Sequence, residues 1–303
     1  MNALAISFAA AAFAALSNLF FRKNTLHSPY ASSSGFLVLF YFISFVTSIV
    51  INPSVLLSDI NFIVVFIGGC VGMLNIALMH VTSRALKHGP AGLTFAFQNT
   101  SAVFPGLLLF LMFDPVYGFS CTPLQLIGMF FVICGLFLGA KKESSDSSKT
   151  SPKWFVYAIG CFAIQMCALT LIQGRCVLFD CDKIGGFLSA FAVNENDDKW
   201  FMPAQFGVAF LLQSVFFLTE KRRLSKPELT YGFLSGIANF SSTCLLLLAT
   251  KFALPFEKSM LFPCFSVGTL LLCNTWAKKL YKEDFNLASN AMCSLGVFIG
   301  VLA

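Results

Sequence analysis

Charged residues are scarce in this sequence. Asp, Glu, Lys and Arg make up only 11% of its 303 residues, whereas a soluble domain averages about 25%. Such a chain cannot cover a water-facing surface, which excludes an ordinary soluble globular protein. The net charge of +6 does not indicate a nucleic-acid partner either, because the basic residues lie at the ends of apolar runs rather than in one patch.

Motifs of catalysis and cofactor binding are also missing. The chain has 3 His, no Cys-x-x-Cys, no nucleotide-binding loop, no zincin motif and no Gly-x-Ser-x-Gly. Most of the 11 Cys lie within apolar runs, where a thiol acts as a small apolar side chain. We therefore expect no enzyme activity, no metal site and no cofactor.

Apolar runs dominate what is present, with 57% apolar residues and 37 Phe. A membrane-spanning helix needs about 20 apolar residues. We predict an all-α polytopic membrane protein with ten transmembrane helices, embedded in a lipid bilayer. The predicted helices span residues 3–21, 34–51, 62–83, 90–112, 122–140, 154–173, 200–219, 229–249, 254–276 and 286–303.

A sequence repeat relates the two halves of the chain. The stretch 68–91 aligns without gaps to 232–255. Five positions are identical: Gly68, Gly72, Asn75, Ala85 and Lys87 match Gly232, Gly236, Asn239, Ala249 and Lys251. Each copy reads Gly-x3-Gly-x2-Asn, which puts two glycines on one helix face, where another backbone can approach closely. The alternative is an ordinary packing pair with a hydrogen-bonded core Asn.

The polar linker at 141–153 divides the helices into five and five. We therefore predict a first repeat at 1–140 and a second at 154–303. Five is odd, so the second repeat enters the membrane in the opposite sense, as in transporters built from inverted repeats. Both halves end alike, with Gly135-x3-Gly139 and Gly296-x3-Gly300.

Basic residues predict the orientation. Most of the 20 Lys and Arg lie in the odd-numbered loops, which the positive-inside rule places in the cytoplasm, with both termini outside. The one long loop, 174–199, is acidic and contains a short apolar run at 184–193. That run is too short to span; it is either an interfacial or lid segment or part of a structureless loop.

The chain resembles the EamA-type branch of the drug/metabolite transporter superfamily over nearly its whole length. The resemblance rests on Ser17-Asn18 closing the first helix, on the passage ALKHGPA at 85–91, on Pro105 within helix 4, and on LQLIG at 124–128. The family's Gly-Glu pair before helices 5 and 10 is only partly kept, with Glu283 in the second copy and Asp114 in the first. Family members are commonly described with both termini in the cytoplasm; we keep the orientation that the charge count predicts, with both termini outside.

The resemblance implies secondary active transport by alternating access, with one central cavity between the halves. It also implies a small polar or amphipathic metabolite as the substrate, protons as a candidate coupling ion, a monomer or homodimer, and a bacterial cytoplasmic (inner) membrane. An integral-membrane lipid-modifying enzyme and a non-transporting membrane scaffold are the alternatives. The enzyme would need an intramembrane cluster of His, Asp and Glu.

Polar side chains inside the spans are the candidate substrate-binding residues, because polar groups are costly in lipid unless they face a bundle or a wet cavity. The candidates are Asn18, Asn75, His80, Gln98, Asn99, Gln165, Asn239, Glu257 and Lys258. For each amide, the alternative is a hydrogen bond between helices worth about 1 kcal/mol. For Glu257, the alternative is an interfacial pair with Lys258 that reaches towards the membrane boundary.

Overall fold

The computed structural model describes residues 2–30, 32–88, 91–113, 119–143, 152–179, 190–282 and 287–302. Every regular element in these ranges is an α-helix or a 3-10 helix. Most of the predicted linker, at 144–151, lies outside the described residues, as do 180–189 of the long loop and the family-motif positions Asp114 and Glu283.

The helices follow the predicted segments within a few residues at most ends. In chain order they are α1 (Ala3–His27), α2 (Ser34–Ile51), η1 (Pro53–Leu57), α3 (Phe62–His88), α4 (Ala91–Thr100), η2 (Ser101–Val103), α5 (Phe104–Phe113), α6 (Pro123–Glu143), α7 (Pro152–Gly174), η4 (Glu195–Trp200), α9 (Phe201–Thr219), α10 (Lys226–Phe252), α11 (Pro255–Lys258), α12 (Leu261–Tyr281) and α13 (Leu287–Val301). The fourth and ninth predicted helices are interrupted.

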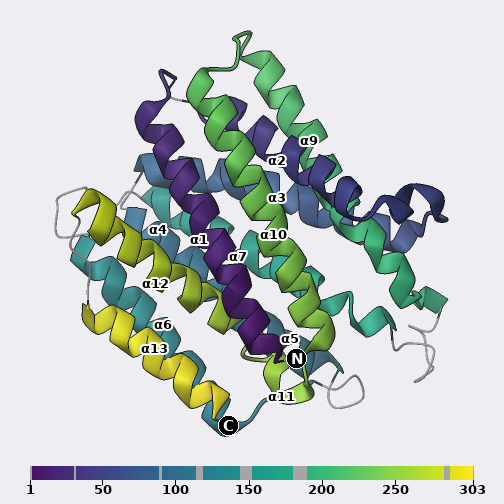
Figure 1. Ribbon diagram of the computed structural model, residues 1–303. Coiled ribbons are helices and arrows are strands. Elements are labelled where there is room, and N and C mark those ends of the chain that lie inside the picture. The colour runs from purple at the N-terminus through teal and green to yellow at the C-terminus, as the bar shows by residue number, and fades with distance from the viewer. Residues whose placement is uncertain are drawn as a thin grey trace. The chain divides into compact units, whose positions relative to one another are not determined.

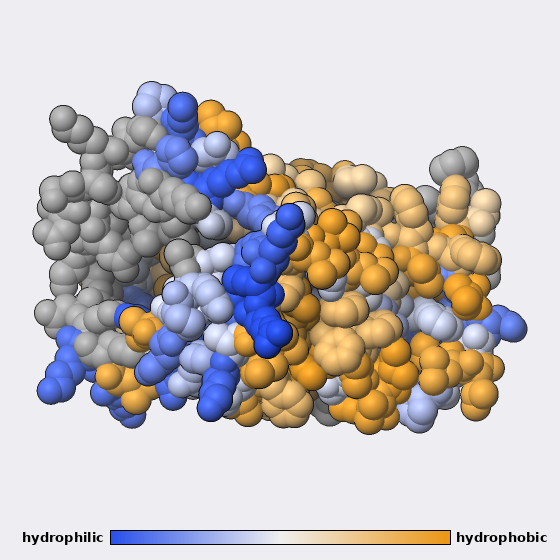
Figure 2. Space-filling model, turned by 90° about the horizontal axis from the view of Figure 1, so that it is seen from above, coloured by the Kyte–Doolittle hydropathy of each residue, from blue (hydrophilic) through white to orange (hydrophobic). Residues whose placement is uncertain are grey.

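Six helical segments among the described residues are long and apolar enough to cross a membrane. They are Ala3–His27, Ser34–Ile51, Phe62–Ala85, Pro152–Phe179, Asn196–Thr219 and Lys226–Phe252. In Figure 2, hydrophobic side chains cover a broad part of the visible face, as lipid-facing surfaces do. The chain is a multi-pass integral membrane protein.

The chain forms two compact units, and each unit combines segments from both halves of the sequence. The first unit contains 1–8, 77–174 and 247–303, and the second contains 9–76 and 175–246. Helices α1, α3 and α10 contribute residues to both units. Compactness and internal repetition are different properties, so the predicted five-helix repeats stay a prediction.

Close packing of α3 on α9 in the second unit depends on the glycines of the repeat. A Cβ at Gly68 would lie 2.6 Å from the carbonyl oxygen of Phe201, and one at Gly72 would lie 2.4 Å from that of Gln205. Both distances are well inside van der Waals contact, so only glycine lets the two backbones approach this closely. The close approach that the Gly-x3-Gly pattern predicts is confirmed.

The second copy of the pattern packs in the same way on α2, within the same unit. A Cβ at Gly232 would lie 3.2 Å from the carbonyl oxygen of Phe36, and one at Gly236 would lie 2.8 Å from that of Phe40. Glycine therefore serves as a backbone contact in both copies.

In the first unit, α6 and α13 pack along most of their lengths and lie side by side in Figure 1. A Cβ at Gly128 would lie 2.5 Å from the carbonyl oxygen of Gly296, and one at Gly135 would lie 2.6 Å from the Cys293 Sγ. Ser289 adds a hydrogen bond from its Oγ to the Gly135 carbonyl oxygen at 2.6 Å. The glycines that end the two halves thus hold these helices together.

Candidate functional site

The nine candidate residues are divided between the two compact units. The second unit holds Asn18, Asn75 and Asn239, and the first holds His80, Gln98, Asn99, Gln165, Glu257 and Lys258. The two groups are described separately below.

The ninth predicted helix is broken near its start, in the first unit. Helix α10 ends at Phe252, the four-residue α11 begins at Pro255, and α12 begins at Leu261. Proline lacks an N–H group and cannot continue a helical hydrogen-bond ladder. The segment between Phe252 and Leu261 therefore exposes backbone carbonyl groups that need other donors.

Two buried glutamines supply those donors. Gln125 of α6 donates its Nε2 to the carbonyl oxygen of Phe256 at 2.6 Å, and Gln173 of α7 donates its Nε2 to that of Lys258 at 2.7 Å. Both side chains are almost fully buried. Each backbone group left unsatisfied in lipid costs several kcal/mol, so these amides stabilise the interruption. Neither was among the candidates.

Glu257 is buried inside this interruption, with 4% of its surface exposed. Its Oε2 accepts a hydrogen bond from the Leu254 N–H at 2.9 Å, at the amino end of α11. The Lys258 ammonium group lies 4.4 Å from the ring centroid of Phe119, a cation–π contact. Both residues therefore contact protein groups in the first unit, and neither side chain is fully exposed.

The fourth predicted helix is interrupted too. A 3-10 turn at Ser101–Val103 separates α4 from α5, and Pro105 lies at the start of α5. A mid-helix 3-10 turn often marks a hinge. The carbonyl oxygen of Asn99 accepts a hydrogen bond at 3.5 Å from the Oγ of Ser266, which lies on α12. A polar contact thus joins the two interrupted helices next to the 3-10 turn.

The remaining candidates of the first unit are His80 on α3, Gln98 on α4 and Gln165 on α7. Thr82 of α3 donates its Oγ1 to the Gln98 Oε1 at 3.4 Å, so Gln98 makes the hydrogen bond between helices that was its alternative. His80 of α3 and Gln165 of α7 are half-buried. Gln98 and Asn99 lie on the turn of α4 that precedes the interruption.

In the second unit, Asn239 also makes a hydrogen bond between helices. Its Nδ2 donates to the Ser44 Oγ at 3.2 Å, and Ser44 itself donates to the Gly236 carbonyl oxygen at 2.9 Å. Asn75 is half-buried and Asn18 is exposed. Of the two repeat asparagines, Asn239 on α10 therefore contacts α2.

Ser17, next to Asn18, is the buried polar residue at the end of the first predicted helix. Its hydroxyl lies 2.7 Å from that of Ser235 on α10. A neighbouring residue on a helix points about 100° away, so Asn18 cannot share this contact. The candidate named here was Asn18, which is exposed; the buried polar side chain at this place is that of Ser17.

Two further glutamines of α9 are buried in the second unit, and the prediction missed both. Gln213 has no exposed surface, and neither its Oε1 nor its Nε2 has a hydrogen-bond partner among the described residues. The same holds for the Oε1 of Gln205. Both residues are amides within the predicted helix 200–219, so the criterion used for the other candidates could have identified them.

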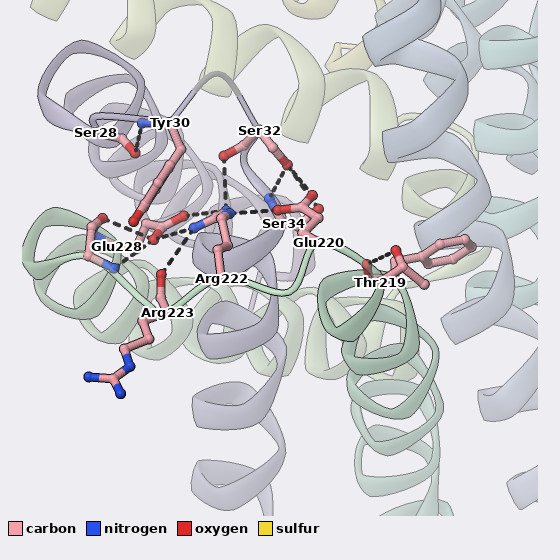
Figure 3. A network of polar contacts seen from close by, with 11 residues as sticks. Ser28, Tyr30, Ser32, Ser34, Thr219, Glu220, Arg222, Arg223 and Glu228 are labelled. Atoms are coloured by element: carbon pink, nitrogen blue, oxygen red, sulfur yellow. Dashed lines mark hydrogen bonds and ion pairs between the residues drawn. The ribbon is translucent and has the colours of Figure 1, made fainter.

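Arg222 is the centre of a cluster at the start of α10 (Figure 3). Its Nη1 and Nη2 donate to the two oxygens of Glu228 at 3.0 and 2.9 Å, and its Nε donates to Glu220 at 2.6 Å. The guanidinium carbon lies 4.1 Å from the ring centroid of Tyr30. Glu228 is fully buried, and a Cβ at Gly35 would lie 2.6 Å from its Oε1. This Arg222 cluster joins the α1–α2 and α9–α10 connections.

The pKa of Glu220 lies below its ordinary value. Burial alone would raise the pKa, but hydrogen bonds from Ser32 and Ser34 and the charge of Arg222 outweigh burial. A carboxyl whose pKa falls on folding stabilises the folded protein above its unfolded pKa, about 4.3, and this contribution is lost as the pH falls through the folded pKa.

We therefore expect Glu220→Gln to destabilise the protein by about 1–2 kcal/mol near neutral pH and progressively less below about pH 4. Thermal unfolding of the wild type and the variant in the same detergent, measured from neutral to acidic pH, checks this. A difference in melting temperature that stays constant over the whole range contradicts the assignment.

A second buried ion pair orders the described ends of the long loop. Arg175, at 4% exposure, donates its Nε to Asp198 at 2.8 Å, and its guanidinium carbon lies 5.1 Å from the ring centroid of Phe201. Val193 donates its N–H to the Leu178 carbonyl oxygen at 3.1 Å. The loop ends are therefore structured; residues 180–189, which include most of the predicted apolar run, lie outside the described residues.

Comparisons with known proteins concern the fold. No protein-family model matches the chain, and no curated protein matches it. Among solved structures, 27 chains are similar. One of them, described only as a crystal structure of a protein, has a TM-score of 0.69 at 13% identity, covering 99% of this chain and 98% of its own. At that identity the likeness carries no function with it.

Proposed function

We propose that this protein is a secondary active transporter of the EamA type, which moves a small polar or amphipathic metabolite by alternating access. The observation that carries the proposal is the pair of interrupted helices, α4–η2–α5 and α11–α12. Transporters place their binding sites at discontinuous helices, because interrupted backbone at membrane depth is tolerated only inside protein or beside a cavity.

The position of the two interruptions supports an arrangement of ten spans in two inverted repeats. They fall in the fourth predicted helix of the first half and in the fourth of the second. The glycine contacts are reciprocal as well: the third helix of the first half packs on α9, the second helix of the other half, and α10 packs on α2. Inverted repeats related by a two-fold axis produce contacts of this reciprocal kind.

Polar groups gather around the interruptions, which supports a small polar or amphipathic substrate. Gln98, Asn99 and Ser266 bring amide, carbonyl and hydroxyl groups that here bond to protein, and Glu257 brings a buried carboxylate. A carboxylate at such a place needs a partner, a cavity or a proton, which supports protons as the coupling ion. For the membrane itself, the family resemblance favours the bacterial cytoplasmic membrane, and fractionation of expressing cells tests that location.

A direct test begins with the purified protein and a library of small metabolites. A substrate binds the folded state and raises its melting temperature, by an amount that grows with concentration. Hits are then assayed for uptake into proteoliposomes with and without a pH gradient. Saturable uptake of a stabilising metabolite supports the proposal; stabilisation without any uptake or exchange supports the scaffold alternative.

We expect Glu257→Gln to abolish the response of uptake to a pH gradient and to keep exchange of substrate across the membrane. The Gln oxygen can still accept the Leu254 N–H bond, so the start of α11 is kept while the charge is lost. Uptake and exchange in proteoliposomes measure the two activities.

Glu257→Met is the matched control, because it removes the charge and the hydrogen bond together. We expect it to lower the melting temperature where Glu257→Gln does not. If Glu257→Gln transports with the pH dependence of the wild type, Glu257 only caps the helix.

A further inference from the structure

The second unit contains a cavity of about 260 Å³ at one end of its helices. Phe45 and Ile49 of α2, Val55 and Leu56 of η1, and Trp200 and Pro203 at the start of α9 form much of its wall. None of the nine candidate residues lines it.

The side chains that line this cavity are apolar except for the indole N–H of Trp200. That N–H donates to the Ser58 Oγ at 3.1 Å and to the Asp59 carbonyl oxygen at 3.0 Å. A buried water needs two to four polar partners, and apolar cavities of about 150 Å³ stay dry and accept hydrocarbon ligands. The cavity is therefore suited to a hydrocarbon and unsuited to a polar metabolite.

The mouth of the cavity is continuous with an exposed apolar surface. Leu56 and Ile60 line the cavity and are 65% and 50% exposed. Their neighbours Ile51 and Leu57 are 64% and 93% exposed. The connection 52–61 carries one charged residue, Asp59, and no Lys or Arg. Because it joins two membrane-spanning helices, a surface of this kind is covered by lipid rather than by water.

Trp200 places the mouth at the boundary of the membrane. Tryptophan is enriched at membrane interfaces, where its ring contacts hydrocarbon and its N–H finds a polar partner. Here the ring faces the cavity while the N–H bonds Ser58 and Asp59. An acyl chain entering from the adjoining leaflet would thus meet an apolar opening at the depth where acyl chains begin.

We propose that this cavity binds one acyl chain of a membrane phospholipid, with the chain seated between α2, η1 and the start of α9. The residues that line the cavity are not those of the interrupted helices, and binding of an acyl chain does not depend on transport activity. Binding to this one site saturates as the lipid concentration rises, whereas contact with bulk lipid does not.

The test uses a phosphatidylcholine with a photoreactive diazirine in the middle of one acyl chain, added to the protein in digitonin micelles. Labelled residues are located by mass spectrometry of peptides. We expect labelling of Val55 and Phe45, which line the cavity and are buried and half-buried, to saturate and to be displaced by excess unlabelled phosphatidylcholine. Labelling of the exposed α9 residue Val215 is expected to rise without saturation.

A matched pair of variants tests the cavity itself. Val65 of α3 lines the cavity, and Val65→Phe fills part of it, which should reduce labelling at Val55 and Phe45 at least about tenfold. Val215→Phe makes the same change at a residue that is 61% exposed and does not line the cavity. It should leave labelling of the cavity residues unchanged.

Labelling at Val55 and Phe45 that does not saturate, or that persists in Val65→Phe, overturns the proposal. If Val65→Phe does not fold, Ile49→Trp fills the same cavity from α2 and decides the question by the same readout. The melting temperature of each variant in digitonin shows which case applies.

Discussion

Arg222→Gln is expected to lower the free energy of unfolding by about 3–5 kcal/mol, because it leaves a buried carboxylate without its counter-ion. Glu228 has no exposed surface, and both its oxygens accept from the Arg222 guanidinium. Its other donors among the described residues are the N–H and hydroxyl of Ser225, which carry no charge. Thermal or denaturant unfolding in a fixed detergent measures the loss.

Arg223→Gln is the matched control, since the Arg223 side chain is exposed and an exposed charge contributes about 0–1 kcal/mol. The double variant Arg222→Gln/Glu228→Gln removes both charges, and we expect it to recover part of the loss. Arg222→Lys keeps the charge but not the bidentate hydrogen bonding, so its melting temperature should lie between those of the wild type and Arg222→Gln. Equal melting temperatures for Arg222→Gln and Arg223→Gln would show that the cluster does not stabilise the fold.

Gly72→Ala is expected to destabilise the protein by about 1–3 kcal/mol, the usual cost of overpacking a well-packed contact. The added methyl group would lie 2.4 Å from the Gln205 carbonyl oxygen and 3.3 Å from the Ala209 nitrogen. Both atoms belong to the α9 backbone, so relief requires α3 and α9 to move apart. Folded yield and melting temperature in detergent report the change.

Gly69→Ala provides the control on the same helix. Its methyl group would lie 3.5 Å from the Val208 Cγ2, an ordinary contact. Alanine favours a helix over glycine by about 1 kcal/mol, so Gly69→Ala should be neutral or stabilising. Gly72→Ala is therefore expected to lower the melting temperature and Gly69→Ala to keep or raise it. A similar decrease for both variants would contradict the packing argument.

Hydropathy alone was enough to predict where most helices begin and end. Apolar runs of about 20 residues have few alternatives to helix in lipid, because the backbone must bond internally. The disagreements have local causes. Helix α1 continues to His27 through a polar stretch that the hydropathy criterion cut at residue 21. Helices 4 and 9 were predicted as continuous, but they are interrupted beside Pro105 and Pro255. The second interruption is stabilised by hydrogen-bond donors from other helices, which local sequence does not show.

The candidate site was only partly predictable. Asn239 and Gln98 make the hydrogen bonds between helices that were the alternative to substrate contact, and Glu257 is buried. The substrate-binding role of the nine candidates stays a prediction. Gln125, Gln173 and the Arg222 cluster were missed. Gln125 and Gln173 are amides like the chosen ones, and nothing in their local sequence indicates that they bond the backbone of a distant interrupted helix.

The sequence by itself determined the membrane class, most of the helical segments and the close-packing glycines. Each of these depends on residue type or on neighbours within a few positions. The tertiary structure decided which face of each helix is buried: Ser17 rather than Asn18, and Gly72 against α9. In a membrane both the interior and the lipid-facing surface are apolar, so hydrophobic periodicity cannot distinguish the two faces. Contacts between distant segments, such as Gln173 with Lys258, exist only once the helices have packed.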